Sequence, residues 1–198
     1  MSKLGDKKLS KSYPVILTVG AFIGLVASFW QVVERIFMLK NPGAELSCNL
    51  NPILDCGTVL GNRWSALFGF PNALLGIVMF TILFTIGLML LNGNKKKKWF
   101  WKVFLAVMIM LILFSVWFFA TSLYVIGKIC IFCIFIWTVS VPIFLYGIDW
   151  LITNNYLKGS WTTSKAIVTL RNYQTETIVS VYATMLLLYF FRFRDFYY

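Results

Sequence analysis

The stretch that decides the fold is residues 99–148, WFWKVFLAVMIMLILFSVWFFATSLYVIGKICIFCIFIWTVSVPIFLYGI. It contains two apolar runs, Trp99 to Ile126 and Ile129 to about Ile148, and only Gly127 and Lys128 lie between them. Each run has the roughly 20 apolar residues that an α-helix needs to cross a bilayer. With so short a connection, the two runs predict a tight antiparallel hairpin of transmembrane helices.

Three further apolar segments flank this hairpin: Tyr13 to Val33, Phe70 to Leu91, and a weaker one from about Gln174 to Phe191. The first is too long for a cleaved signal peptide, and no small-x-small site follows it. The chain is 60% hydrophobic and 13% charged, whereas a soluble domain is about 25% charged. No segment alternates between apolar and polar residues as the strands of a membrane β-barrel do. The sequence predicts an all-α integral membrane protein, a single domain over residues 1–198.

Lysine and arginine are distributed unevenly among the connections. The N-terminal tail and the connections around residues 95–102 and 149–176 hold twelve of the 18 basic residues and three of the seven acidic ones. Because basic residues are retained on the cytoplasmic side of a membrane, the N-terminus is expected to be cytoplasmic. The net charge of +11 is then explained by basic residues that flank the membrane spans on the cytoplasmic side. We therefore expect membrane lipid but no nucleic acid as a partner.

Four cysteines stand out against this topology. Cys48 and Cys56 lie in the polar loop between the first two spans, and Cys130 and Cys133 begin the fourth span. All four are expected on the outer side, where disulfides typically persist. Positions i and i+3 share a helix face, and the first turn of a helix stabilises a thiolate. The pattern predicts thiol–disulfide exchange, with Cys133 lying deeper than Cys130.

Other interpretations of the cysteines stay open from the residues alone. One alternative is a non-catalytic membrane scaffold in which the cysteines form two structural disulfides. A zinc site is another, although the seven residues between Cys48 and Cys56 do not resemble a zinc knuckle, and we expect no metal. A C-x-x-C pair in an apolar helix is also compatible with core packing. The chain has no histidine and seven acidic residues, which argues against imidazole or paired-carboxylate catalysis.

An electron acceptor for Cys133 has to be lipid-soluble, because this cysteine is expected inside the helix bundle. The sequence has no nucleotide-binding glycine motif and no histidine to hold haem. A membrane quinone is the natural two-electron partner of a dithiol, and its pocket should be apolar and aromatic with one or two polar anchors. Asn72, which follows Pro71 at the outer end of the second span, is a candidate anchor, unless it only caps the helix.

Two stretches resemble the bacterial homologues of the vitamin K epoxide reductase family. They are Cys48-Asn-Leu-Asn-Pro-Ile-Leu-Asp-Cys56-Gly-Thr-Val-Leu and Leu67-Phe-Gly-Phe-Pro-Asn72-Ala-Leu-Leu-Gly76, and the Cys130-x-x-Cys133 pair completes the set. The similarity covers about residues 13–150. It implies a four-helix transmembrane bundle around a quinone of the ubiquinone, menaquinone or vitamin K type, with a fifth helix at about residues 174–191.

The resemblance also implies residue roles. Cys130 and Cys133 would be the redox centre beside the quinone, Cys48 and Cys56 the shuttle pair, and Asn72 the quinone's hydrogen-bond partner. Phe132, Trp137 and Trp64 would complete the quinone site. Members reoxidise thioredoxin-like proteins in the periplasm, and many carry such a domain fused after the fifth helix. None follows here, so a separate thioredoxin-like partner is expected.

The chain departs from the family pattern at two places. Ile131 and Phe132 stand where many bacterial members have proline and an aromatic residue between the helix cysteines. Trp137 stands where the animal enzymes carry tyrosine. Disulfide formation at the bacterial cytoplasmic membrane is therefore the expected function, and reduction of vitamin K epoxide or quinone as the useful reaction is the alternative.

Overall fold

The computed structural model describes residues 2–44, 46–93, 97–157, 159, 162 and 164–197, and the side chains of these except at residues 2–11 and 195–197. Its helices are α1 (Ser2–Lys40), α2 (Cys56–Gly61), the 3₁₀ turn η1 (Arg63–Ala66), α3 (Asn72–Leu91), α4 (Lys98–Ala120), the π-helical turn η2 (Thr121–Ile126), α5 (Ile131–Thr153), α6 (Lys165–Asn172) and α7 (Gln174–Tyr197). Among the charges compared above, Glu45, Lys95, Lys96 and Lys158 lie outside the described residues, as do the side chains of Lys3, Asp6, Lys7, Lys8, Lys11 and Asp195.

Five helical segments are long and apolar enough to cross a membrane: Ser12–Lys40, Asn72–Leu91, Lys98–Ile126, Ile131–Thr153 and Gln174–Arg194. The predicted all-α membrane fold is confirmed, and each span lies where an apolar run predicted it. The fourth helix begins at Ile131, so Cys130 precedes it rather than occupying its first turn. The fifth span is the least buried of the five.

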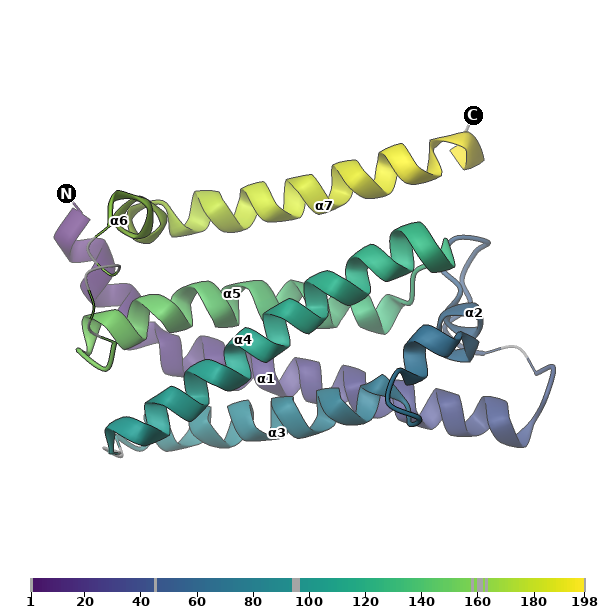
Figure 1. Ribbon diagram of the computed structural model, residues 1–198, viewed down its shortest axis with the longest axis horizontal. Coiled ribbons are helices and arrows are strands. Elements are labelled where there is room, and N and C mark those ends of the chain that lie inside the picture. The colour runs from purple at the N-terminus through teal and green to yellow at the C-terminus, as the bar shows by residue number, and fades with distance from the viewer. Residues whose placement is uncertain are drawn as a thin grey trace.

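Four of these helices form the bundle. The first helix, α1, packs mainly against α3 and α5, and α4 packs against α5 (Figure 1). The last helix, α7, runs along the outside of the bundle and makes few contacts with it. Figure 1 places the N-terminus and α6 at one end of the molecule, with α2 and the C-terminus at the other. Every connection that carries cysteine therefore lies at the end opposite the N-terminus.

Glycines allow α1 and α3 to approach closely. A Cβ atom at Gly24 would lie 2.4 Å from the ring of Phe80, and one at Gly87 would lie 2.4 Å from Thr18 Oγ1. Small residues at such crossings are common where helices associate in lipid, because packing there replaces the hydrophobic driving force. These contacts hold α1 and α3 together at two levels along the bundle.

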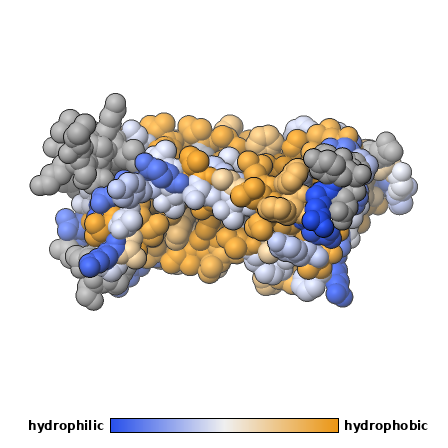
Figure 2. Space-filling view, turned by 90° about the horizontal axis from the view of Figure 1, so that it is seen from above, coloured by the Kyte–Doolittle hydropathy of each residue, from blue (hydrophilic) through white to orange (hydrophobic). Residues whose placement is uncertain are grey.

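The buried side chains form two clusters, one behind the other along the bundle. The first contains large aromatic residues such as Tyr13, Phe104 and Trp150 and lies toward the N-terminal end. The second contains all four cysteines, together with Leu46, Ile53, Val59, Leu60, Phe118, Leu123, Ile129, Trp137 and Phe193. Apolar side chains also dominate the middle of the molecular surface, and hydrophilic ones gather at both ends (Figure 2). The cysteines thus share one end of the bundle.

Candidate active site

The loop that carries Cys48 and Cys56 is docked onto the connection between α4 and α5. Leu54 and Ile129 form an isolated parallel bridge. Within it the Asp55 N–H donates to the Ile129 carbonyl at 3.0 Å, and the Ile129 N–H donates to the Ile53 carbonyl at 2.9 Å. The Lys128 ammonium adds a hydrogen bond to the Pro52 carbonyl. This bridge sets the loop in register with the residues just before α5.

Short polar side chains fold the loop locally. Asn51 Oδ1 accepts from the N–H groups of Ile53 at 2.9 Å and Leu54 at 2.7 Å, which makes an Asx turn. Asp55 caps α2, since its Oδ1 accepts from the Thr58 N–H at 3.0 Å. Cys56 is the first residue of α2 as a result. The turn and the cap together aim this cysteine at the bundle.

The connection from α4 to α5 has an unusual conformation. The end of the apolar run winds into the π-helical turn η2, closed by a hydrogen bond from the Gly127 N–H to the Ser122 carbonyl at 2.9 Å. Gly127 has φ +68°, a region in which glycine pays no steric penalty. Cys130 follows in an extended conformation, and its carbonyl accepts from the Cys133 N–H at 3.0 Å. π-Turns inside helices are frequent at functional sites.

The four sulfur atoms meet at this place. All four cysteines are buried free thiols. Cys56 Sγ lies 3.1 Å from Cys130 Sγ, although 74 residues separate them in the chain. On the far side of Cys130, Cys133 Sγ accepts a hydrogen bond from Gln31 Nε2 of α1 at 3.2 Å. The order in space is therefore loop cysteines, then Cys130, then Cys133.

Hydrogen bonds among the thiols separate their acidities. A hydrogen bond from the Cys130 thiol, followed by one from Cys48 and one from the Ile131 backbone, lowers the pKa of Cys56 well below its ordinary value. The bond to Cys56 and burial raise the pKa of Cys48. Bonds with Cys133 and Cys56 raise the pKa of Cys130. The thiol of Cys56 is thus made more acidic, and those of Cys48 and Cys130 less acidic.

A buried carboxylate on α1 holds the other loop cysteine in place. Glu34 Oε1 accepts from the Ser47 hydroxyl, which immediately precedes Cys48, and from Trp30 Nε1 at 3.3 Å. Its negative charge also contributes to raising the pKa of Cys48. The first helix therefore contacts both cysteine pairs, through Glu34 on the loop side and Gln31 on the helix side.

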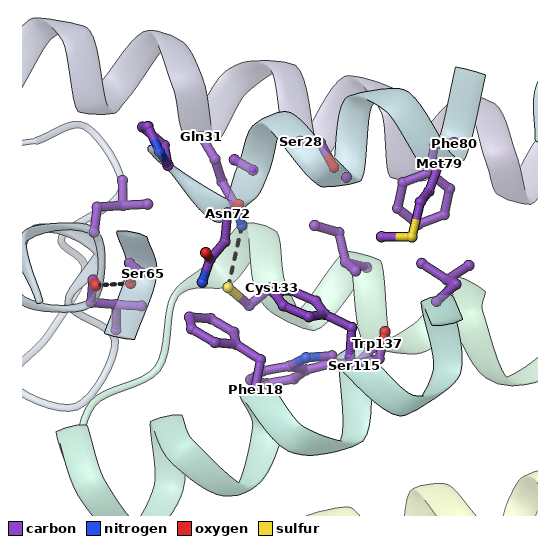
Figure 3. Close-up of a pocket in the computed structure, with 18 residues that line it drawn as sticks. Ser28, Gln31, Ser65, Asn72, Met79, Phe80, Ser115, Phe118, Cys133 and Trp137 are labelled. Carbon is purple, nitrogen blue, oxygen red and sulfur yellow. Dashed lines mark hydrogen bonds between the residues drawn. The ribbon is translucent and has the colours of Figure 1, made fainter. Parts of the chain in front are cut away.

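A cavity begins at the sulfur of Cys133. It is lined by Ser28, Gln31, Val59, Leu60, Ser65, Pro71, Asn72, Ala73, Gly76, Met79, Phe80, Leu111, Phe114, Ser115, Phe118, Cys133, Ile136 and Trp137. Figure 3 shows the Cys133 sulfur beside Gln31 and Asn72, with Phe118 and Trp137 across from them. Its walls come from α1, α3, α4, α5 and the loop of α2, so it lies at the centre of the bundle.

Asn72 reaches this cavity but is already engaged. Its Oδ1 accepts from the Leu67 N–H at 3.1 Å, and its Nδ2 donates to the Trp64 carbonyl at 2.7 Å. It therefore fastens the loop before α3, which neither the anchor nor the helix-cap interpretation foresaw. An amide nitrogen carries two hydrogens, so one N–H of Asn72 is left for a ligand.

The predicted aromatic residues are placed differently from one another. Trp137 lines the cavity, and its ring packs edge-on against Phe119 at 5.0 Å. Trp64 gives its carbonyl to Asn72, but its ring packs on Trp117 and is not among the lining side chains. Phe132 lines a separate groove between α1 and α5. It cannot share the face of Cys133, because consecutive residues of a helix point about 100° apart.

A quinone ring suits the chemistry of this lining. The walls are apolar and aromatic, and the few polar groups include one N–H of Asn72 and the Ser28 hydroxyl, a buried atom without a hydrogen-bond partner. The cavity measures about 50 Å³, so a ring requires lining side chains to move. Met79 is the adaptable one, since its unbranched thioether changes rotamer easily.

Sequence reasoning missed the contribution of α1. Ser28, Gln31 and Glu34 recur every three residues in an otherwise apolar run, which places them on one face of the helix. Polar residues inside a membrane span usually face the bundle interior and mark a functional site. That spacing was a signal from which all three could have been found.

The family comparison agrees with this arrangement. The model of the vitamin K epoxide reductase family matches residues 15–148, about two thirds of the chain. The match begins in α1 and ends in α5, so it covers the bundle, both cysteine pairs and the cavity. A search of curated proteins found no match.

Proposed function

The chain belongs to the vitamin K epoxide reductase family, and on that premise we propose that it oxidises the thiols of a partner protein and passes the electrons to a quinone. The observation that carries the proposal is the 3.1 Å contact between Cys56 and Cys130, together with the position of Cys133 at the central cavity. The two cysteine pairs and the cavity form one continuous path for electrons.

Exchange with the partner is the first step. In the oxidised protein a disulfide joins Cys48 and Cys56. A partner thiolate attacks Cys48, which forms a mixed disulfide and releases Cys56 as a thiolate. The partner's second thiolate then attacks its own sulfur in the mixed disulfide and releases Cys48. The Ile131 N–H, whose hydrogen bond lowers the pKa of Cys56, remains in place to stabilise the released thiolate, and a thiol of lower pKa leaves faster.

Transfer within the protein is the second step. The Cys56 thiolate attacks Cys130 in the Cys130–Cys133 disulfide and displaces Cys133 as a thiolate. Cys48 then attacks Cys56, which restores the loop disulfide and releases Cys130. Two electrons have moved from the loop pair to the helix pair. The contact between Cys56 and Cys130 supports this choice of sulfur atoms.

The helix pair is reoxidised at the cavity. A bound quinone accepts two electrons and two protons, and Cys130 and Cys133 rejoin as a disulfide. Gln31 holds the Cys133 sulfur beside the cavity. Phe118 and Trp137 keep water from the cavity wall. Asn72, with its second N–H, remains a candidate donor to the ligand.

The proposed partner is a separate thioredoxin-like protein on the outer side of a bacterial cytoplasmic membrane. The charge distribution favours a cytoplasmic N-terminus. The separation of the N-terminus from α2, at opposite ends of the bundle, supports placing the cysteines outside (Figure 1). Ser47 and Asn49, which flank Cys48, are exposed to such a partner.

The test is turnover of the purified protein in detergent with a reduced thioredoxin-like protein and ubiquinone-1. We expect one quinone to be reduced for every two partner thiols lost, as followed by quinone absorbance and thiol titration. Cys133→Ser should stop turnover and accumulate a Cys56–Cys130 disulfide, which mass spectrometry identifies. Cys48→Ser should accumulate the same bond.

Two results would overturn the proposal. Stable Cys48–Cys56 and Cys130–Cys133 disulfides with no quinone reduction would support the structural scaffold instead. A trapped Cys48–Cys130 bond would keep the enzyme but reverse the roles of the two loop cysteines.

A further inference from the structure

The hydroxyl of Ser28 is buried without a partner. The residue is 0% exposed, and its Oγ makes no hydrogen bond. A buried polar group left unpaired is destabilising, so each one calls for an explanation. Among the described residues, the other buried side-chain atoms without a partner are Trp101 Nε1 and Ser122 Oγ. Neither of these residues lines the cavity, whereas Ser28 does.

Local backbone does not satisfy this hydroxyl. Serine and threonine in a helix commonly donate to the carbonyl four residues earlier. Thr18, Thr81 and Thr138 do so here at 2.7 to 2.8 Å. Ser28 makes no such bond. Its hydroxyl is therefore free for a ligand that enters the cavity.

Close packing explains the size of Ser28 but not its oxygen. A Cβ atom at Gly76 would lie 2.5 Å from Ser28 Oγ, so α1 and α3 require small residues at this crossing. Alanine would meet that requirement equally well and would leave no buried hydroxyl unpaired. The oxygen therefore needs a reason other than packing.

The position of Ser28 relative to the sulfur suggests that reason. Ser28 and Gln31 are three residues apart on α1 and share one face of the helix. Gln31 contacts the Cys133 sulfur, and Ser28 lines the same cavity one helical turn away along α1 (Figure 3). A quinone ring has carbonyl oxygens on two opposite edges, so one placed against Cys133 directs its other oxygen along the cavity.

We propose that the Ser28 hydroxyl donates a hydrogen bond to the quinone carbonyl that is farther from Cys133. The inference rests on the proposed function and adds a second polar contact from α1, opposite the sulfur. It assigns Ser28 to binding and orientation of the acceptor ring, with no part in the exchange among the cysteines.

The test compares Ser28→Ala with Ser122→Ala in the full-length protein. Both variants remove a buried, unpartnered hydroxyl, but only Ser28 lines the cavity. The probe is ubiquinone-1 labelled with ¹³C at one carbonyl or the other. Infrared difference spectra report the hydrogen bond at each carbonyl, and quenching of tryptophan fluorescence reports the dissociation constant.

In the unmutated protein, one labelled carbonyl should absorb at a lower frequency than in free quinone and should shift in D₂O. Ser28→Ala should abolish that shift and weaken binding by about three- to ten-fold, the usual value of one hydrogen bond. Ser122→Ala should change neither. When Cys48→Ser is added to each, trapping of the Cys56–Cys130 bond should be equal in all three proteins.

An unchanged carbonyl band and dissociation constant in Ser28→Ala would assign Ser28 to packing alone while leaving the proposed function standing. Failure of the unmutated protein to bind the quinone would overturn the quinone site and this role together. If Ser28→Ala does not fold, Ser28→Gly takes its place, because glycine keeps the close approach to Gly76 and removes the same hydroxyl; an unchanged carbonyl band in that variant would contradict the proposal.

Discussion

At the scale of single residues, the chemistry of each thiol is set by the neighbours that donate to it. Cys56 receives hydrogen bonds from Cys130 and Cys48, and its pKa is lowered. Cys130 and Cys48 act as the donors, and their pKa values are raised. The lowered pKa of Cys56 favours it over Cys48 and Cys130 as the attacking group, because the thiolate is the nucleophile in disulfide exchange.

This arrangement predicts how Cys56 responds to loss of its main donor. Cys130→Ala removes the hydrogen bond, so the pKa of Cys56 should rise toward its ordinary value. Its reaction with a small methanethiosulfonate should then be slower near pH 6 and recover as the pH is raised. Cys130→Ser keeps a hydroxyl donor and serves as the matched control. Equal pH profiles for the two variants would exclude Cys130 as the cause of the shift.

The hydrogen bond from Gln31 to Cys133 leads to a second prediction. Gln31→Leu keeps the approximate size of the side chain but removes the donor. Loss of one hydrogen bond costs about 0.5–1.5 kcal/mol, and bonds to charged groups cost more. Quinone reduction should slow by roughly three- to ten-fold. Stopped-flow quinone absorbance measures this step, and trapping of the Cys56–Cys130 bond, which should be unchanged, is the control.

The site residues differ in how well sequence could predict them. The four cysteines follow from their spacing within the predicted topology. Trp137 follows because it lies four residues after Cys133 and therefore on the same helix face. Asn72 was predicted as a quinone anchor and does line the cavity, but its contacts to Leu67 and Trp64 depend on how a loop folds back, which no local pattern encodes. Phe132 was misplaced because its neighbour in sequence points to another side of α5.

At the scale of secondary structure, the short α2 helix fixes the position of Cys56. Its capping residue Asp55 predicts a matched pair of variants. Asp55→Ala should lose about 1 kcal/mol of local stability and slow formation of the Cys56–Cys130 bond, because the first turn of α2 loses its anchor. Asp55→Asn retains an oxygen that accepts from the Thr58 N–H. Quenched-flow trapping with mass spectrometry compares the rates, and similar slowing by both variants would point to charge rather than capping.

The transmembrane helices could be predicted from the sequence, but the position of the loop that carries Cys48 and Cys56 could not. Apolar length and the two-residue connection at Gly127 and Lys128 are local properties, and they predicted the transmembrane helices. The bridge between Leu54 and Ile129 joins residues 75 positions apart in the chain. It forms only once the hairpin and the loop are both in place, so no segment taken alone predicts it.

At the scale of the whole molecule, the outlying helix α7 is attached to the bundle near both ends and also near its middle, where the Tyr182 hydroxyl donates to the Thr138 carbonyl of α5 at 2.5 Å. Arg171 of α6 pairs with Asp149 of α5 at 2.5 Å, near the N-terminal end of the bundle. At the other end Arg192 donates to the Leu123 carbonyl at 3.2 Å, and Phe193 joins the cluster that contains the cysteines. The helix thus covers part of the active site from outside the residues matched by the family.

The orientation of the molecule yields a topology prediction. Leu50 and Trp99 are both well exposed, and they lie in the cysteine loop and at the start of α4, respectively. In a cysteine-free variant, Leu50→Cys should react with an impermeant maleimide in intact cells. Trp99→Cys should react only after the cells are permeabilised. The reverse pattern would contradict the outward placement of the redox centre.

The arrangement of two clusters in series has a bioenergetic consequence. The buried side chains of the first cluster are apolar and aromatic, and the hydroxyl of Tyr13 among them donates to the Ile143 carbonyl and contacts Met108. We expect this apolar layer to keep the protons released by a partner's thiols from crossing toward the N-terminal end. Turnover in proteoliposomes should be electroneutral, so a voltage-sensitive dye should stay constant while quinone is consumed. A dye response that tracks turnover would reveal a proton wire through the bundle.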